Sequence, residues 1–300
     1  MYIIPNHGAC AILFKQKDPL NTMPELPEVE TTKRGIAAYA KNTLIQQVIV
    51  HNPRLRWPVD LTRTKQLAGQ IIHSVQRRGK YLLFFCDYLH FIIHLGMSGS
   101  LRMTQHDEHI KKHDHIQLVL DNQQTITFND PRRFGCFIVT PEPLNHKLIT
   151  KLGVEPLSAD FHANYLYKRL QNKKINIKQC IMNSQWLVGV GNIYANEALF
   201  LSGIHPLRPA NSLSHSECLL LVQQIKQILR TAIRHGGTTL KDFINAQGKP
   251  GYFQQTLNVY GRANKPCHHC GNLLHETRIN SRSTVFCSVC QHLNINQTPA

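Results

Sequence analysis

Four cysteines near the C-terminus have the spacing of a metal site. They form two close pairs separated by sixteen residues, at Cys267, Cys270, Cys287 and Cys290. Four thiolates arranged in two such pairs supply a closed tetrahedral zinc site, with no position left for water. A module this short cannot bury a sufficient core alone, so metal binding would supply its folding free energy. The pattern predicts one structural Zn²⁺ ion, and free or redox-active thiols are the alternative.

A proline–glutamate pair carries a second possible chemistry. Pro24 and Glu25 follow Met23 in the stretch NTMPELPEVE, which reads like the start of a protein although 22 residues precede that methionine. A chain beginning at Pro24 would have a free secondary amine, and terminal amines have a pKa of about 8, so part of it is unprotonated at neutral pH. Inside a longer chain the same nitrogen is an amide, whose lone pair is delocalised into the carbonyl. Catalysis by this pair therefore depends on where the mature chain begins.

Several turns present side chains that could meet a nucleic acid. Lys80 stands at a strand start in RRGKYLLFF, and His113 stands at a strand edge in KKHDHIQL. The turn of NDPRRFG exposes Arg132 and Phe134, while Met97 lies between glycines in HLGMSGSLR. Arginines beside an aromatic side chain suit backbone contact plus a wedge between bases. Solvated surface cations and apolar core residues are the alternative interpretation of each.

Two further stretches offer sites for anions. VGVGNIYANE contains a glycine-rich turn before a helix, with Asn192 near the helix N-cap, and N–H groups at such a position can hold a phosphate. A plain turn between two helices is the alternative. Arg282 lies between the two cysteine pairs on a predicted hairpin, where a guanidinium can meet phosphate. A solvated surface arginine is the alternative there.

The composition favours a polyanionic partner. Lys plus Arg outnumber Asp plus Glu by 34 to 18, giving a formal net charge of +16. That excess attracts nucleic acid, although an unusually basic enzyme is the alternative. The sequence contains no run of 18 apolar residues, so a membrane span is not expected. The first 22 residues lack the basic start of a signal peptide. Five scattered cysteines suggest reduced thiols and a cytosolic protein: Cys10, Cys86, Cys136, Cys180 and Cys218.

The chain divides by its apolar periodicity. Residues 23–140 open with a helix starting at Pro27 and continue as many short strands, a pattern typical of a β-sandwich or barrel. Residues 141–159 contain prolines and are predicted to be a linker. Residues 160–256 are helical, with a capping box from Ser214 to Glu217 before the clearest helix and Gly236 after it. The cysteine module spans 257–293, and 294–300 form a tail.

The motifs in combination resemble those of the bacterial formamidopyrimidine-DNA glycosylase family. They occur in the family's order from Met23 to about Gln291: MPELPEVE, RRGKYLL, HLGMSGSLR, KHDH, DPRRFG, VGVGNIYANE, GGTTLKDF, GKPGYF, VYGR and the four-cysteine finger. The sister family, endonuclease VIII, handles oxidised pyrimidines and resembles the chain less, because its start usually reads proline-glutamate-glycine where this chain has Leu26 in third place. The resemblance implies an α+β multidomain fold: an N-terminal β-sandwich with an N-terminal helix, a helix–two-turns–helix domain and a C-terminal zinc-finger β-hairpin.

The resemblance also implies an activity and a set of roles. The activity is that of a monomeric bifunctional DNA glycosylase and abasic-site lyase of base excision repair. It removes oxidised purines (8-oxoguanine and formamidopyrimidines) from double-stranded DNA through a Schiff base, followed by β,δ-elimination. Pro24 would be the nucleophile, Glu25 the acid/base, Lys80 an aid to β-elimination, and Arg282 a contact to the phosphate released by δ-elimination. The implied DNA-backbone contacts are His113, Arg132, Lys173 and Asn192, and the implied fillers of the hole left by the extruded nucleotide are Met97, Arg132 and Phe134.

Three details qualify this expectation. We expect translation to start at Met23, whose removal exposes the Pro24 amine, so that residues 1–22 lie outside the working enzyme; a chain that kept them would be an inactive, lesion-binding relative. Asn183 stands where members of the family carry aspartate, which could weaken orientation near the glycine turn, although an amide can still hydrogen-bond. The glycine-rich stretch 236–252 would cover the everted base.

Overall fold

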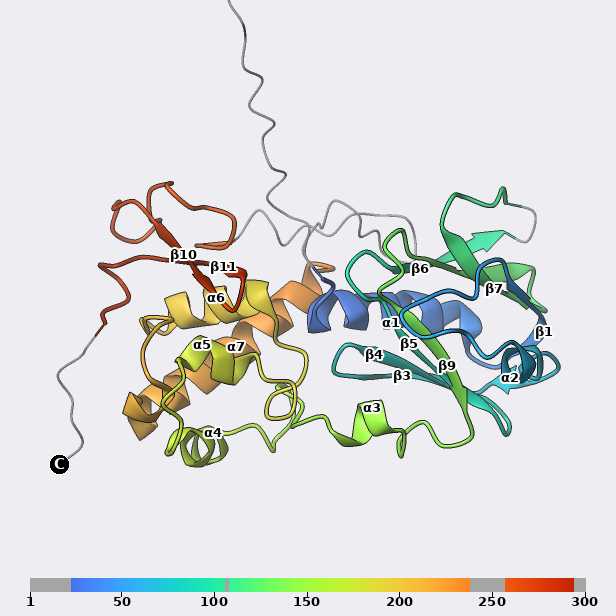
Figure 1. The fold of residues 1–300 in the computed structure, drawn as a ribbon, viewed down its shortest axis with the longest axis horizontal. Coiled ribbons are helices and arrows are strands. Elements are labelled where there is room, and N and C mark those ends of the chain that lie inside the picture. Colours follow the sequence, from blue (N-terminus) through green and yellow to red (C-terminus); the bar gives the residue numbers. More distant parts are fainter. Residues whose placement is uncertain (1–22, 106–107, 238–256, 294–300) are drawn as a thin grey trace, which may run out of the picture.

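Two lobes and a small hairpin make up the described chain. The structure, a computed structural model, describes residues 23–105, 108–237 and 257–293. A β-sandwich forms the lobe at the right of Figure 1, and helices form the lobe at the left, with the C-terminal hairpin above the helices. Helix α1 (Leu26–Ala40) contacts strands of both sheets and also helix α7 of the other lobe, so it ties the two lobes together.

The β-sandwich consists of two antiparallel sheets. The five-stranded sheet has the order β2 (Ile71–Ile72), β1 (Thr43–Val50), β7 (Asp114–Leu120), β8 (Gln124–Asn129), β6 (Ser100–Gln105). The four-stranded sheet has the order β3 (Ser74–Arg78), β4 (Tyr81–Phe85), β5 (His90–His94), β9 (Cys136–Thr140). A short helix, α2 (Leu61–Lys65), follows β1. The predicted sandwich is confirmed. Within it, the apolar stretch QIIHSVQ contains both β2 and β3, which belong to different sheets.

Aromatic and β-branched side chains fill the space that the sheets and α1 enclose. Phe84 stacks on Phe91 with ring centroids 4.3 Å apart, and Phe91 stacks on Phe137 at 5.1 Å. All three rings are buried. Burying a phenylalanine side chain stabilises a fold by roughly 2–3 kcal/mol, so these rings join β4, β5 and β9 into one rigid layer. The turn between β3 and β4 is attached to that layer.

The helical lobe is built around the longest helix, α7 (His215–Arg234). Its predicted capping box is present: Glu217 donates its N–H to the Ser214 hydroxyl at 3.2 Å, and Ser214 donates its N–H to the Glu217 carboxylate at 2.8 Å. Gly236, with φ of 76°, follows its end. Helices α4 (Ala163–Leu170) and α6 (Asn192–Leu201) pack on α7. The shorter elements are α3 (Lys147–Thr150), which lies within the predicted linker, α5 (Ile177–Ile181) and the 3₁₀ turn η1 (Ala210–Ser212).

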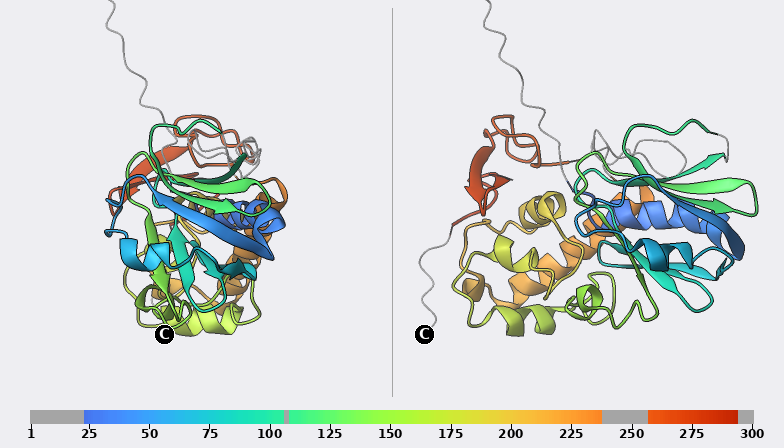
Figure 2. Two further views of the ribbon diagram at one scale, coloured as in Figure 1. Left: turned by 90° about the vertical axis from the view of Figure 1, so that its right-hand side faces the viewer. Right: turned by 45° about the vertical axis from the view of Figure 1, so that its right-hand side comes forward.

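The C-terminal hairpin pairs β10 (His275–Ile279) with β11 (Arg282–Phe286). Its two turn residues, Asn280 and Ser281, have φ of 47° and 61°, as a type I′ turn requires. Strand β11 contacts α6, and Figure 2 shows the hairpin standing on the helical lobe with the β-sandwich on the other side. Within the described ranges, none of the helices is long and apolar enough to cross a membrane.

Candidate active site

The Glu25 carboxylate is buried on the N-terminus of a helix from the other lobe. Its side chain is 2% exposed. One carboxylate oxygen accepts the N–H of Gly191 at 2.7 Å, and the other accepts the N–H of Ile193 at 2.8 Å. The Leu26 N–H adds a bond to the Gly189 carbonyl at 3.1 Å. The glycine turn before α6 therefore holds an anion, as its sequence allows, but within the described chain that anion is the Glu25 carboxylate.

Glycine at position 191 lets this carboxylate and a lysine approach the same point. A Cβ atom on Gly191 would lie 2.4 Å from Glu25 Cδ and 2.7 Å from Lys80 Nζ, both far inside normal contact distances. The two side chains therefore converge on one face of the turn. Gly189 is equally constrained, because its φ of 89° disfavours other residues and a Cβ there would lie 2.7 Å from Leu26 Cδ1.

Lys80 reaches this point from the two-residue turn between β3 and β4. Gly79, the first turn residue, has φ of 58°, the conformation that favours glycine. Burial lowers the pKa of Lys80, the Glu25 charge opposes that shift, and the Arg282 charge adds to it. Burial raises the pKa of Glu25, against the opposing charge of Lys80. A carboxyl group that holds its proton more tightly than usual beside an amine that holds its proton less tightly is suited to proton transfer near neutral pH.

Arg282 approaches the same region from the hairpin. It is exposed at the start of β11, and its charge acts on both Lys80 and Lys178. It lines a pocket of about 240 Å³ together with Lys178, Gln179, Met182, Ile279 and Asn280. The site therefore combines the Glu25 carboxylate at the N-cap of α1, the Lys80 amine of the β-sandwich and the Arg282 guanidinium of the hairpin.

The four cysteines meet as their spacing predicts. Their sulfur atoms all lie within 4.8 Å of one another, with Cys267 and Cys290 sulfurs 3.9 Å apart and Cys270 and Cys287 sulfurs 3.5 Å apart. The His269 N–H points at the Cys267 sulfur at 3.4 Å. Four sulfur donors gathered at one point fit a single zinc ion and leave no open coordination position.

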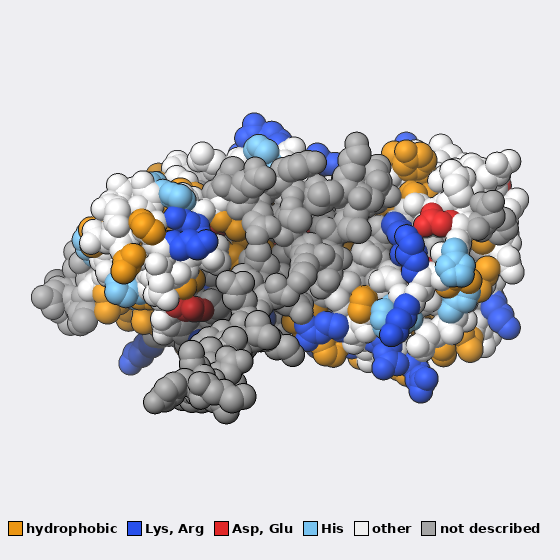
Figure 3. All heavy atoms as spheres, turned by 90° about the horizontal axis from the view of Figure 1, so that it is seen from above, with side chains coloured by type: hydrophobic (Ala, Val, Ile, Leu, Met, Phe, Trp, Pro, Cys, Tyr) orange, Lys and Arg blue, Asp and Glu red, His pale blue; other side chains and the backbone are white. Residues whose placement is uncertain are grey.

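Two loops bring the predicted wedge residues together. The Asp130 carboxylate, fully buried, accepts the Ser98 hydroxyl at 2.8 Å and the Gly135 N–H at 2.7 Å. It thereby fixes the loop that exposes Phe134, whose ring lies 4.9 Å from the Arg132 guanidinium. Met97, half-buried, lines one pocket with Phe134. Lys and Arg side chains lie on both lobes of the face seen in Figure 3, where Asp and Glu are few.

The other residues singled out in the sequence come from both lobes. His113 is half-buried with φ of 78°, and its ring lies 6.4 Å from that of His115. The Lys173 ammonium lies 5.4 Å from the Trp186 ring. Asn183 does make a hydrogen bond, accepting the Gln185 N–H at 2.9 Å. Of the stretch 236–252, all but the first two residues lie outside the described residues.

Comparisons with known proteins identify three family models along the chain. These are the formamidopyrimidine-DNA glycosylase N-terminal domain over 23–137, its H2TH domain over 152–244, and the zinc finger found in FPG and IleRS over 264–293. The formamidopyrimidine-DNA glycosylase of Hydrogenovibrio crunogenus is 53% identical over 270 residues, 90% of this chain and 96% of the relative. That of Shewanella oneidensis is 54% identical over 270 residues, 90% of this chain and 99% of the relative.

The chain belongs to the formamidopyrimidine-DNA glycosylase family. Solved structures agree: wild-type Lactococcus lactis Fpg in complex with N7-benzyl-Fapy-dG DNA superposes with a TM-score of 0.83 at 33% identity, covering 90% of this chain and 100% of that one. The Thermus thermophilus MutM structure gives 0.80 at 35% identity, covering 89% and 98%. The predicted family, fold and single zinc ion are confirmed, and the cysteine cluster lies within the family's zinc finger.

Two buried charges of this family member escaped the sequence analysis. Lys178, 1% exposed on α5, donates to the Thr284 hydroxyl at 2.7 Å and the Ser283 carbonyl at 3.2 Å. Glu197, fully buried on α6, accepts the N–H groups of Val259 and Tyr260, both at 2.8 Å. Asn192 donates to the Ser283 carbonyl at 3.0 Å. Lys178 and Asn192 hold the hairpin on the helical lobe, and Glu197 holds the segment before it. Nothing in their local sequence pattern distinguishes them from surface residues.

Proposed function

We propose that this chain is a bifunctional DNA glycosylase and abasic-site lyase that removes oxidised purines from duplex DNA. Its relatives carry the name formamidopyrimidine-DNA glycosylase, and a solved relative holds Fapy-dG-containing DNA. The observation that carries the proposal is the buried Glu25 carboxylate beside Lys80. Pro24 directly precedes Glu25 in the chain. That group of residues provides a nucleophile, an acid/base and a second amine at one point.

Pro24 supplies the nucleophile once its nitrogen is uncapped. The free secondary amine attacks the sugar C1′ atom, the glycosidic bond breaks, and the base departs. Ring opening then leaves an iminium ion, whose fixed positive charge acidifies the neighbouring C2′ proton. Loss of that proton expels the 3′ phosphate. This chemistry requires a mature chain that begins at Pro24, and the family model and its relatives support that boundary because the matched region starts at residue 23.

Glu25 and Lys80 divide the proton transfers. A carboxyl group whose pKa is raised by burial can deliver a proton to the sugar ring oxygen and then act as a base. Lys80, whose pKa burial lowers, lies close enough to help abstract the C2′ proton in β-elimination. Arg282 would bind the phosphate that δ-elimination releases, since its side chain is exposed and its charge acts on Lys80.

The loops above the site hold and open the duplex. Met97, Arg132 and Phe134 would fill the hole that the flipped nucleotide leaves, offsetting an unstacking cost of a few kcal/mol. Phe134 is 45% exposed, so its ring is available for insertion between bases. His113, Lys173, Asn192 and Arg132 would contact the DNA backbone, and the net charge of +16 adds long-range attraction. Because its substrate would be chromosomal DNA, we infer that the enzyme acts in the bacterial cytoplasm, at the nucleoid.

A borohydride trapping assay tests the proposal. The form starting at Pro24 should crosslink covalently to a duplex with 8-oxoguanine opposite cytosine and should nick it, whereas Pro24→Gly should be strongly impaired. The form with residues 1–22 attached should bind and give no adduct, because its Pro24 nitrogen is an amide. Binding without any adduct from the Pro24-start form would instead indicate a DNA-binding protein without this chemistry. A duplex with an oxidised pyrimidine measures the sister activity in parallel.

A further inference from the structure

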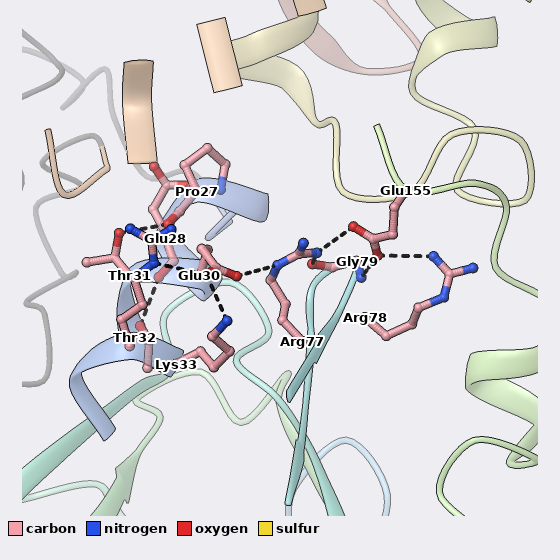
Figure 4. Close-up of polar contacts among 11 residues, drawn as sticks. Pro27, Glu28, Glu30, Thr31, Thr32, Lys33, Arg77, Arg78, Gly79 and Glu155 are labelled. Atoms are coloured by element: carbon pink, nitrogen blue, oxygen red, sulfur yellow. Dashed lines mark hydrogen bonds and ion pairs between the residues drawn. The ribbon is translucent and has the colours of Figure 1, made fainter. Parts of the chain in front are cut away.

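A carboxylate from the segment that joins the lobes contacts the backbone just before Lys80. Glu155 accepts the N–H of Gly79, the residue before Lys80, at 2.6 Å. The same carboxylate accepts the Arg77 guanidinium at 2.8 Å and the Arg78 guanidinium at 3.0 Å. Figure 4 shows Arg77 and Arg78, at the end of β3, and Gly79 of the turn converging on Glu155. Its side chain is 22% exposed, so solvent screens these contacts only in part.

Both peptide groups around Gly79 are fixed by this arrangement. Arg77 also donates to the Gly79 carbonyl at 3.0 Å and to the Glu30 carboxylate at 3.0 Å. The Gly79 N–H is therefore held by Glu155 itself. The Gly79 C=O is held by Arg77, a side chain that Glu155 contacts. Because the Gly79 carbonyl belongs to the peptide bond that leads into Lys80, fixing it fixes the start of the Lys80 side chain.

The anchor itself is attached to the lobe that seats Glu25. Val154 exchanges backbone hydrogen bonds with Trp186 and Val188, at 3.2 and 3.1 Å, just before the glycine turn. Val188 also packs on Gly79 so closely that a Cβ there would lie 2.1 Å from Val188 Cγ2. Glu155 thus links the turn that carries Lys80 to the strand-like segment that leads to Gly191, whose N–H holds Glu25.

We propose that Glu155 is a positioning residue for the reaction, setting the distance between the Lys80 amine and the Glu25 carboxylate across the boundary between the lobes. The inference rests on the proposed function, in which those two groups transfer protons. Glu155 touches neither substrate nor reacting atoms, so its effect is on the geometry of Lys80. A displacement of about 1 Å at a reacting group can lower a rate about a hundredfold.

The test compares Glu155→Ala and Glu155→Gln in the Pro24-start protein. Alanine removes every contact, while glutamine keeps an oxygen for the Gly79 N–H and loses the charge that faces Arg77. Glu142→Gln is the matched control, because Glu142 is an exposed carboxylate earlier in the same connecting segment. The measurements are single-turnover strand cleavage of a preformed abasic-site duplex from pH 5.5 to 9.5, affinity for an uncleavable abasic-site analogue, and thermal unfolding.

We expect cleavage to fall about a hundredfold in Glu155→Ala and about tenfold in Glu155→Gln, with affinity changed less than about threefold. The pH profile should also move, because the pKa of Lys80 depends on its separation from Glu25. The control should match wild type. Variants that lose thermal stability but keep the rate and the pH profile would overturn the positioning role, as would a loss confined to affinity. Wild-type protein that neither traps nor cleaves would defeat the proposed function and this role with it, whereas active wild type with unaffected variants defeats this role alone.

Discussion

Replacing Gly191 by alanine should disable the acid–base pair while leaving the fold in place. The added Cβ would lie 2.4 Å from Glu25 Cδ and 2.7 Å from Lys80 Nζ, whereas ordinary contact begins near 3.4 Å. Glu25 must therefore retreat by about 1 Å and Lys80 by about 0.7 Å, if the backbone holds. The backbone offers no other reason for a defect, because Gly191 has φ of −125°, which alanine adopts freely.

The magnitude follows from what Glu25 loses as it moves. Its two hydrogen bonds from the α6 N-terminus are bonds to a charged group, and such bonds contribute about 1.5–3 kcal/mol each. A misplacement of about 1 Å corresponds to a loss of about a hundredfold in the chemical step. Forcing one methyl group into a packed site costs about 1–3 kcal/mol of stability, which a folded domain can survive.

The assay is single-turnover cleavage of an 8-oxoguanine duplex by the Pro24-start protein, with thermal unfolding measured on the same sample. Gly203→Ala is the control, since Gly203 has φ of 65° with only one atom, the Cys290 carbonyl oxygen at 3.5 Å, near its Cβ position. The control should lose some stability and keep its cleavage rate. A Gly191→Ala protein that cleaves within about threefold of wild type would refute the account of Glu25 and Lys80, because both groups would then tolerate displacement.

Three further results are expected. Burial lowers the pKa of Lys178 from 10.5 to about 7. Between these two pH values the unfolded chain binds one more proton than the folded chain, so the free energy of unfolding rises with pH, by up to about 1.4 kcal/mol per pH unit. Lys178→Met should remove that slope, as measured by urea titrations at successive pH values. Cys290→Ser should lower the zinc content below one ion per chain, measured by elemental analysis, and weaken DNA binding as the hairpin loses its folding free energy. Arg132→Ala should reduce the slope of log affinity against log salt concentration by about 0.9 if Arg132 neutralises one phosphate.

Local patterns in the sequence were enough for the metal site and for part of the secondary structure. The Ser214–Glu217 capping box is set by residues three positions apart, and the zinc cluster by two short cysteine pairs, so both could be predicted without knowing the fold. The start of strand β9 is hard to locate from the sequence, because CFIVT directly follows the NDPRRFG turn without a break. The division of QIIHSVQ between two sheets also lay beyond local pattern, since a break at His73 shows no glycine or proline.

The site depended on contacts between residues far apart in the sequence, and these could not be predicted. The hydrogen bonds from Gly191 and Ile193 to Glu25 join positions 166 and 168 residues apart. The sequence left a phosphate site and a plain turn between helices both open at the glycine turn, and in the fold its N–H groups hold the Glu25 carboxylate. Glu155 was not predicted to matter, since a lone glutamate in a linker has no distinguishing pattern; only the fold places its carboxylate against Gly79.

The way Glu25 is held explains why one chain needs both lobes for its chemistry. Glu25 belongs to the N-terminal segment, yet its carboxylate accepts hydrogen bonds from Gly191 and Ile193 of the helical lobe. Lys80 comes from the β-sandwich, and Arg282 comes from the hairpin that Lys178 of α5 holds through Thr284. Proton transfer between Glu25 and Lys80 therefore requires the two lobes to keep their relative position. The surfaces that would hold the DNA backbone belong to those same lobes. Changes to the contacts between lobes should accordingly alter cleavage more than binding, whereas changes to Arg132 or Lys173 should alter binding first.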